Sequence, residues 1–256
     1  MHTVSMGQVL SRSFGLVRDN LMSVGLFLLI VQIGESALSL GMAGLGLMHT
    51  DAANPARMLA SGSYAIIAVL YLLTSALTWA GAVHGYVQSA FGRPVSLAAC
   101  FSAGLAKLLP VLLLLILWSL AVGLGWILLI VPGLILISMW SVAIPALVTE
   151  NLSVTQSFGR SRALTRGHRL AIFGVLLLVV VIMYAAIFAG AGLALGSGGF
   201  MAVALAAQGS VPAMIASGLV SWLFGMFLAA LLSALYIELV QAQGSLPTAQ
   251  LSEVFV

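Results

Sequence analysis

Glu35 is the side chain of this sequence best placed to do chemistry, because it lies in the middle of a long apolar run. If residues 21–43 cross a membrane, its carboxyl group lies near the bilayer centre, where a charged side chain costs about 2.5–3.5 kcal/mol on insertion scales. Such residues usually face the interior of a helix bundle and mark a pathway or a binding partner. The alternative is a protonated or locally hydrogen-bonded Glu35 that packs against Gly and Ser residues of neighbouring helices, and both interpretations stay open.

Glu238 is a second candidate for a ligand or pathway residue, near the end of the last apolar run and beside Tyr236. It could pair with one of the arginines that follow Glu150 or with His84. We favour a structural ion pair over a catalytic role, and removing one partner of a buried pair is costly.

Four arginines gather in one short segment between two apolar runs: Arg160, Arg162, Arg166 and Arg169. A guanidinium group binds phosphate through two parallel hydrogen bonds, so this segment could hold a phospholipid headgroup or a phosphorylated ligand. We favour the simpler interpretation, in which the arginines fix the orientation of the chain and contact lipid without specificity.

The rest of the sequence contains no familiar catalytic pattern. The HExxH, GxSxG and P-loop motifs are all missing. Four scattered histidines and one cysteine do not form a metal-binding pattern. We therefore predict no catalytic residue, no metal and no cofactor, and we expect that the protein is not an enzyme.

The elements that must position these residues are membrane helices. Hydrophobic residues make up 62% of the chain and charged residues only 6%, with a mean hydropathy of +1.21. A soluble domain is about a quarter charged, so this chain cannot cover a water-exposed surface. Its apolar runs exceed the roughly 20 residues that cross a bilayer as a helix, the structure that satisfies its own backbone in lipid.

We predict a single polytopic domain over residues 1–256 with six transmembrane helices. The expected spans are 21–43, 63–86, 109–130, 133–149, 170–195 and 213–239. Because residues 108–149 carry no charge, we interpret them as a tight hairpin that turns at Pro132 and Gly133. One long helix kinked at Pro132 is the alternative, but it would place the basic loops on opposite faces of the membrane, against the positive-inside rule.

A short pattern recurs before the first, third and fifth spans: SFGLVR from Ser13, SAGLAK from Ser102 and SRALTR from Ser161. Each copy would end an in-plane cytoplasmic helix and open a helical hairpin, which gives three hairpins and a threefold repeat. The alternative is that any cytoplasmic entry to a span favours small residues, leucine and a basic residue.

Counting the basic residues orients this topology. With a cytoplasmic N-terminus, eight of the nine lie inside and only Arg57 lies outside. The eight are Arg12, Arg18, Arg93, Lys107, Arg160, Arg162, Arg166 and Arg169. This asymmetry predicts a bacterial inner (plasma) membrane protein with both termini in the cytoplasm. The sequence pI near 9.4 then indicates anionic lipid headgroups at the cytoplasmic face as partners, not nucleic acid.

Residues 132–174 carry a family resemblance. They contain PGLILISMWSVAIPALVTEN, then an RSxxLTxGxR pattern from Arg160, then an IFG entry to the next span. This segment resembles the membrane-domain family named after glycerophosphoryl diester phosphodiesterases, and its uncharacterised six-span bacterial relatives. The C-terminal LYIELVQAQG is similar as well, although Val240 stands where many relatives carry arginine.

The resemblance implies the six-span fold and not the phosphodiesterase reaction. In that family the hydrolysis is attributed to a separate soluble barrel domain with metal-binding His and Glu residues, and this chain has none of those residues. Only the membrane part of the family is therefore expected here.

These observations predict a non-enzymatic membrane scaffold or accessory protein, with a role in lipid or envelope homeostasis and an unidentified membrane protein as a further partner. The alternative is a small transporter or channel with a central cavity that uses Glu35. A third class is an intramembrane enzyme that acts on lipid. A cavity lined by Glu35 would favour transport, whereas a sealed core with an exposed apolar flank would favour a scaffold.

Overall fold

Every element of the described chain is a helix. The computed structural model describes residues 5–44, 62–195 and 211–244. In chain order the elements are α1 (Met6–Asp19), the π-helical turn η1 (Leu21–Gly25), α2 (Leu26–Gly44), α4 (Gly62–Ala90), α5 (Leu97–Ala106), α6 (Leu108–Leu128), α7 (Ile130–Met139), α8 (Ala143–Glu150), α9 (Val154–Leu164), α10 (Arg169–Leu195) and α12 (Val211–Ala242).

Five helices of the described residues are long and apolar enough to cross a membrane. These segments are Leu21–Met42, Ala65–Ala90, Leu108–Leu128, Val131–Glu150 and Gly218–Ala242. A sixth is added if α9 and α10, which are bent by 101° relative to each other, count as one broken span. The chain is thus all-helical and compatible with a multi-pass membrane protein, while the layout of three hairpins stays a prediction.

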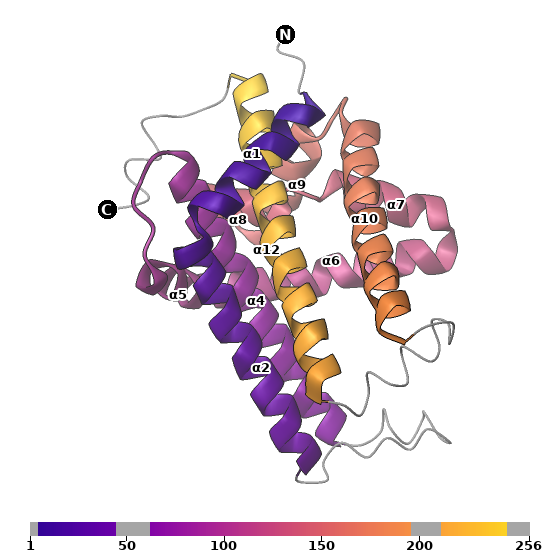
Figure 1. Cartoon of the computed structure of the whole chain (residues 1–256). Coiled ribbons are helices and arrows are strands. Elements are labelled where there is room, and N and C mark those ends of the chain that lie inside the picture. The colour runs from indigo at the N-terminus through magenta and orange to yellow at the C-terminus, as the bar shows by residue number, and fades with distance from the viewer. Residues whose placement is uncertain (1–4, 45–61, 196–210, 245–256) are drawn as a thin grey trace.

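Two apolar clusters hold the bundle together. The larger one lies between α1, α2, α4 and α12, and includes the buried side chains of Phe27, Tyr86 and Met226. The smaller one lies between α4, α6 and α8, around Leu114 and Leu147. The long helix α4 contributes to both clusters and therefore connects the two halves of the molecule (Figure 1).

Short helices end at each copy of the recurring sequence pattern. Helix α1 ends at Asp19, α5 at Ala106 and α9 at Leu164. Ser96 is the N-cap of α5, and its hydroxyl accepts a hydrogen bond from the Ala99 amide at 3.1 Å. The sharp bend between α9 and α10 fits an in-plane helix that leads into a span.

The three copies do not share one environment. Ser13 and Ser161 are buried, and the leucines three residues after them, Leu16 and Leu164, are buried too. In the middle copy Ser102 is exposed and Leu105 is 63% exposed. The first and third copies therefore pack alike and the second does not, and the threefold repeat stays a prediction.

The chain turns between α6 and α7 at Leu129, which has extended backbone angles, and not at Pro132 and Gly133. Pro132 instead lies in the first turn of α7, where an amide has no partner within the helix and proline is tolerated. Gly133 lets α7 approach α6 closely, because a Cβ there would lie 2.9 Å from the Trp126 ring. The predicted fourth span is divided into α7 and α8 by a break at residues 140–142.

Gly81 is the position where α4 packs most closely on its neighbours. A Cβ at this residue would lie 2.5 Å from the ring of Phe27 on α2 and 2.6 Å from the carbonyl oxygen of Cys100 on α5. The ring can move, but the carbonyl belongs to the backbone of α5. A larger residue at Gly81 must therefore separate these helices.

We expect Gly81→Ala to lower the apparent melting temperature of the purified protein in detergent, because overpacking costs about 1–3 kcal/mol. The matched control is Gly123→Ala on α6, where a Cβ has no neighbour within 4 Å. That change should leave the melting temperature unchanged or raise it, since alanine is the better helix former by about 0.8–1.0 kcal/mol. Equal stability of the two variants would contradict the close approach at Gly81.

Candidate functional site

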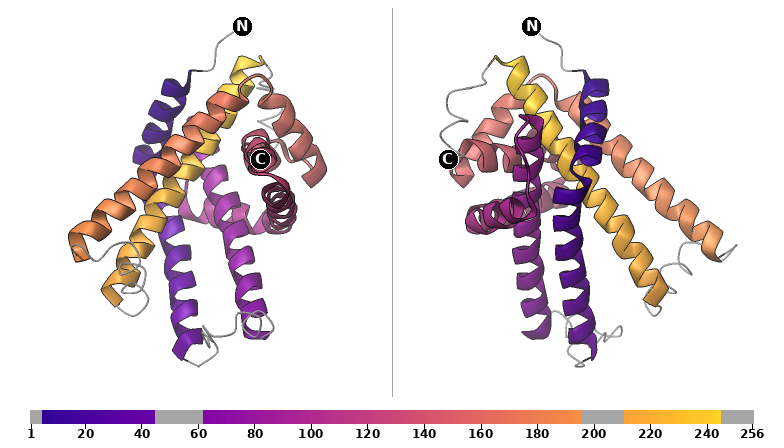
Figure 2. Two further views of the ribbon diagram at one scale, coloured as in Figure 1. Left: turned by 90° about the vertical axis from the view of Figure 1, so that its right-hand side faces the viewer. Right: turned by 60° about the vertical axis from the view of Figure 1, so that its left-hand side comes forward.

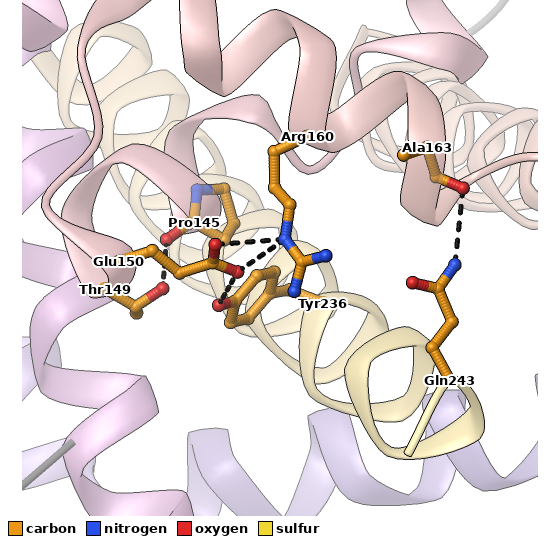
Figure 3. A network of polar contacts seen from close by, with 7 residues as sticks. All are labelled: Pro145, Thr149, Glu150, Arg160, Ala163, Tyr236 and Gln243. Carbon is orange, nitrogen blue, oxygen red and sulfur yellow. Dashed lines mark hydrogen bonds and ion pairs between the residues drawn. The ribbon is translucent and has the colours of Figure 1, made fainter. Parts of the chain in front are cut away.

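A carboxylate at the end of α8 joins three helices. Arg160 Nε on α9 donates to both oxygens of Glu150, at 2.9 and 3.0 Å. The hydroxyl of Tyr236 on α12 donates to Glu150 Oε1 at 2.8 Å. Figure 3 shows the three side chains, here called the Glu150 cluster, converging from α8, α9 and α12. The side chains of Arg160 and Glu150 are 26% and 23% exposed, so the ion pair is largely shielded from solvent.

Further polar contacts extend this junction to α7. The hydroxyl group of Ser161 on α9 donates to the carbonyl oxygen of Met139 at 2.9 Å, and the hydroxyl oxygen of Thr165, the C-cap of α9, lies 3.2 Å from the same carbonyl oxygen. Met139 is the last residue of α7, where carbonyl groups have no partner within the helix. The RSxxLTxGxR pattern therefore supplies Arg160, Ser161 and Thr165 to hold the ends of α7 and α8.

Gln243, just after α12, completes the contacts of α9. Its amide nitrogen donates to the carbonyl oxygen of Ala163 at 3.3 Å (Figure 3). Helix α12 is thus tied to α9 and α8 by both Tyr236 and Gln243.

A second ion pair joins the first helix to the last. Arg12 on α1 lies 2.6 Å from Glu238 Oε1 on α12, and both side chains are partly buried. The sequence predicts a loop arginine or His84 as the partner of Glu238, and the structure gives it Arg12. The reason is the path of α1, which packs along α12 and places Arg12 over this carboxylate (Figure 1). Glu238 therefore does form an ion pair, but its cation is Arg12 and not one of the predicted partners.

The four arginines predicted to contact lipid are not equivalent. Arg160 is held by Glu150. Arg162 and Arg166 are exposed. Arg169 begins α10, and its Nε atom is buried without a hydrogen-bond partner among the described residues. Arg162 and Arg166 are the two whose guanidinium groups project into the surroundings and can meet a phosphate.

Glu35 lines a cavity of about 200 Å³ between α2, α4 and α12. Its polar neighbours there are Gln32 on the same helix, Tyr71, Ser75 and Thr78 on α4, and Ser221 on α12. Among the described residues, no basic side chain lines the cavity and none forms an ion pair with Glu35. The sequence-predicted pathway candidate therefore does lie in a cavity between three helices.

Two of the hydroxyl groups in the cavity, those of Ser75 and Thr78, are oriented as hydrogen-bond acceptors. Ser75 donates its proton to the carbonyl oxygen of Leu72 at 3.0 Å, and Thr78 donates to that of Thr74 at 2.7 Å. Their lone pairs stay available, because the proton of each is used within α4. Together with the Glu35 carboxyl group, they form a lining that suits a cation or a hydrogen-bond donor.

Clusters of three or more His, Cys, Asp or Glu side chains do not occur among the described residues. Glu35 is thus a single carboxyl group surrounded by neutral polar and apolar side chains. The site can bind and orient a ligand by charge and hydrogen bonds.

Comparisons with known protein families, with curated proteins and with solved structures find no match to this chain. The resemblance of residues 132–174 to the glycerophosphoryl diester phosphodiesterase membrane-domain family therefore stays a prediction.

Sequence reasoning missed the partners in both ion pairs. The sequence analysis predicts no role for Glu150, although it is one of only six acidic residues. The available signal was chemical: an acid at the end of an apolar run needs a cation, and Arg160 follows at the start of the arginine-rich segment. Arg12 could not be found in this way, because it is 226 residues away from Glu238.

We expect Arg160→Gln to lower the free energy of unfolding by about 1.5–3 kcal/mol, because the Glu150 carboxylate would lose a charged hydrogen-bond donor. The matched control is Arg162→Gln, on the same helix and exposed, which should change stability by about 0.5 kcal/mol or less. Thermal unfolding of the purified proteins followed by tryptophan fluorescence would compare them. If the two variants were equally stable, the Glu150 cluster would not hold α8 and α9 together.

Proposed function

We propose that this is a non-enzymatic membrane protein that binds a small cationic or hydrogen-bond-donating ligand in the Glu35 cavity, as a small transporter or channel would. The observation that carries the proposal is a carboxyl group without an ion-pair partner in the described residues, in a cavity between three apolar helices. Carboxyl groups within transmembrane segments typically mark substrate or ion pathways.

The composition of the lining supports a cation over an anion. An anionic ligand would meet the Glu35 carboxyl group and the lone pairs of Ser75 and Thr78, and the described lining residues include no basic side chain to balance its charge. A cavity of about 200 Å³ is smaller than the roughly 300–1,000 Å³ of typical drug-sized ligand sites, so the ligand should be small.

A scaffold or accessory protein in lipid or envelope homeostasis is the second candidate. It is favoured by Arg162 and Arg166, which are exposed and project from the arginine-rich segment. Guanidinium groups in this position bind the phosphates of anionic headgroups. In this function the protein would associate with lipid, and with a membrane protein still to be identified, through this surface.

For both candidates we propose the bacterial inner membrane, with both termini in the cytoplasm. Figure 1 supports this orientation, since α1, α9 and the C-terminal end of α12 lie at the same end of the molecule. Helix α1 carries Arg12 and Arg18, α9 carries Arg160 and Arg162, and Arg166 lies two residues after α9. Arg57, the basic residue expected outside, lies beyond the described residues.

We expect Glu35→Gln to weaken the binding of choline and ethanolammonium to the purified protein in lipid nanodiscs at least tenfold, measured by titration calorimetry. Tenfold corresponds to about 1.4 kcal/mol, a modest value for one charge interaction. Glycolate serves as the anionic probe and should not bind. Uptake of the cation into proteoliposomes would distinguish a transporter from a binding protein.

The control for this variant is Asp19→Asn, which neutralises an exposed carboxylate outside the cavity and should leave cation binding unchanged. Without ligand, Glu35→Gln should not lower the melting temperature, because the carboxyl group has no ion pair to lose. Two results together would contradict the proposal and support a structural role. They are a Glu35→Gln protein less stable than the unchanged protein, and no cation binding by either of the two.

The orientation can be tested by thiol labelling, because the native cysteine should not react with the labelling reagent. Cys100 is buried in α5, and burial raises the pKa of its thiol to about 11. The reactive thiolate is therefore scarce at neutral pH and becomes abundant only as the pH approaches that value. We expect no maleimide labelling of the native protein at pH 7.5 until it is denatured.

An Arg162→Cys protein should then react with maleimide in inverted membrane vesicles and not in intact cells treated with a membrane-impermeant reagent. Labelling of this residue from outside intact cells would overturn the proposed orientation.

A further inference from the structure

The α6–α7 hairpin, residues 108–139, runs across the other long helices. In Figure 1 it extends sideways from the bundle, while α2 and α4 run from one end of the molecule to the other. In the left view of Figure 2 the hairpin is seen end-on and α2 and α4 are seen lengthwise. Helices in these two orientations cannot all cross the same flat bilayer.

The distribution of charge indicates which helices cross. Arg12 pairs with Glu238, and Arg160 shares the Glu150 carboxylate with Tyr236, so both arginines lie near the last turns of α12. The opposite end of the molecule is formed by the end of α2 and the start of α4 (Figure 1). The positive-inside asymmetry therefore lies along α2, α4 and α12. The axis of the hairpin has no such asymmetry, since residues 108–139 carry no charged side chain.

Both ends of the segment that contains the hairpin lie at the arginine-bearing end. Lys107, just before α6, donates a hydrogen bond from its ammonium group to the side-chain oxygen of Asn151, just after α8. Glu150 is fixed beside it by Arg160. The chain thus leaves and re-enters the polar end of the molecule at one place.

The surface of the hairpin is apolar apart from Ser119, whose hydroxyl donates to the carbonyl oxygen of Ile116 within α6. Its most exposed side chains form the turn, with Ile127 82%, Leu128 74% and Leu129 68% exposed. Further exposed apolar residues follow both arms: Leu109, Leu113, Leu117, Leu120, Leu124, Trp126, Val131 and Ile135. A turn that reached the opposite headgroups would present polar or interfacial side chains, whereas this turn is aliphatic.

We infer that the α6–α7 hairpin does not cross the membrane but lies in its plane, within the acyl chains of the leaflet on the arginine-bearing side. In-plane helices that rest at the headgroup level have a polar face, and this hairpin has none. Its surroundings are therefore hydrocarbon on every side that the protein does not cover. The hairpin occupies one leaflet only, and its binding partner is the lipid of that leaflet.

Spin-label depth measurements test this inference without any ligand, so they are independent of the Glu35 cavity. Single cysteines in a Cys100→Ala background would replace Leu109, Leu120 and Leu128 on the hairpin. Leu26, Ile33 and Leu40 on α2 would provide the reference for a crossing helix. All six side chains are exposed in the protein and tolerate a label. The labelled proteins would be placed in phosphatidylethanolamine–phosphatidylglycerol liposomes and their depth measured by power saturation with oxygen and a nickel chelate.

The expected result is a similar, oxygen-accessible depth at Leu109, Leu120 and Leu128, against a steady change from Leu26 to Leu40. If α6 crossed, Leu109 and Leu128 would differ in depth by about 28 Å at 1.5 Å per residue. Exposure of Leu128 to the nickel chelate, or labelling of Leu128→Cys from outside intact cells, would overturn the inference. Shielding of Leu128 from both reagents would also overturn it, because a protein and not lipid would then cover the turn.

Discussion

The attachment of α9 to its neighbours through the Glu150 carboxylate is the interaction on which the second half of the molecule depends. An acid at the end of an apolar helix would be costly if it were left without a partner. Arg160 supplies the charge, and Tyr236 brings α12 to the same carboxylate. The hydroxyl groups of Ser161 and Thr165 contact the last carbonyl group of α7. One turn of arginine-rich sequence thus sets the positions of α7, α8 and α12 together.

This junction has a consequence for the helices that precede it. Because α7 and α8 end against α9, the chain from Lys107 to Asn151 must return to the polar end of the molecule. The apolar hairpin between these points is constrained at its base, and α6 packs against α4 and α8. Its direction across α2 and α4 follows from how its base is held, not from its own composition, which would equally suit a crossing helix.

That distinction explains how much could be predicted from the sequence. Composition and run length predict that the protein is helical and apolar, and the recurring pattern predicts the ends of α1, α5 and α9. The turn at Leu129 could not be located, because a proline–glycine pair is a turn signal that the first turn of a helix also accommodates.

The Arg12–Glu238 pair depends on the packing of the first helix against the last, and no local pattern encodes it. The sequence predicts that Glu35 faces the interior of the bundle, because an acid within a membrane favours that position. It does not predict the other walls of the cavity, which come from helices distant in sequence.

The pairing of the other acids gives Glu35 its significance. Of the acidic residues in the described ranges, Glu150 and Glu238 each have an arginine, and Asp19 is exposed at the end of α1. These three lie toward the arginine-bearing end, where charge is tolerated. Glu35 lies half-way along an apolar helix, away from every described arginine ion pair. It lines a cavity in which the hydroxyl groups of Ser75 and Thr78 have already donated their protons within α4. Glu150 and Glu238, the other shielded acids, are each paired with an arginine. An unpaired carboxyl group at Glu35 therefore lowers the stability of the folded protein. The simplest physical reason for keeping it is a partner that comes from outside the chain and carries the missing positive charge or hydrogen-bond donor.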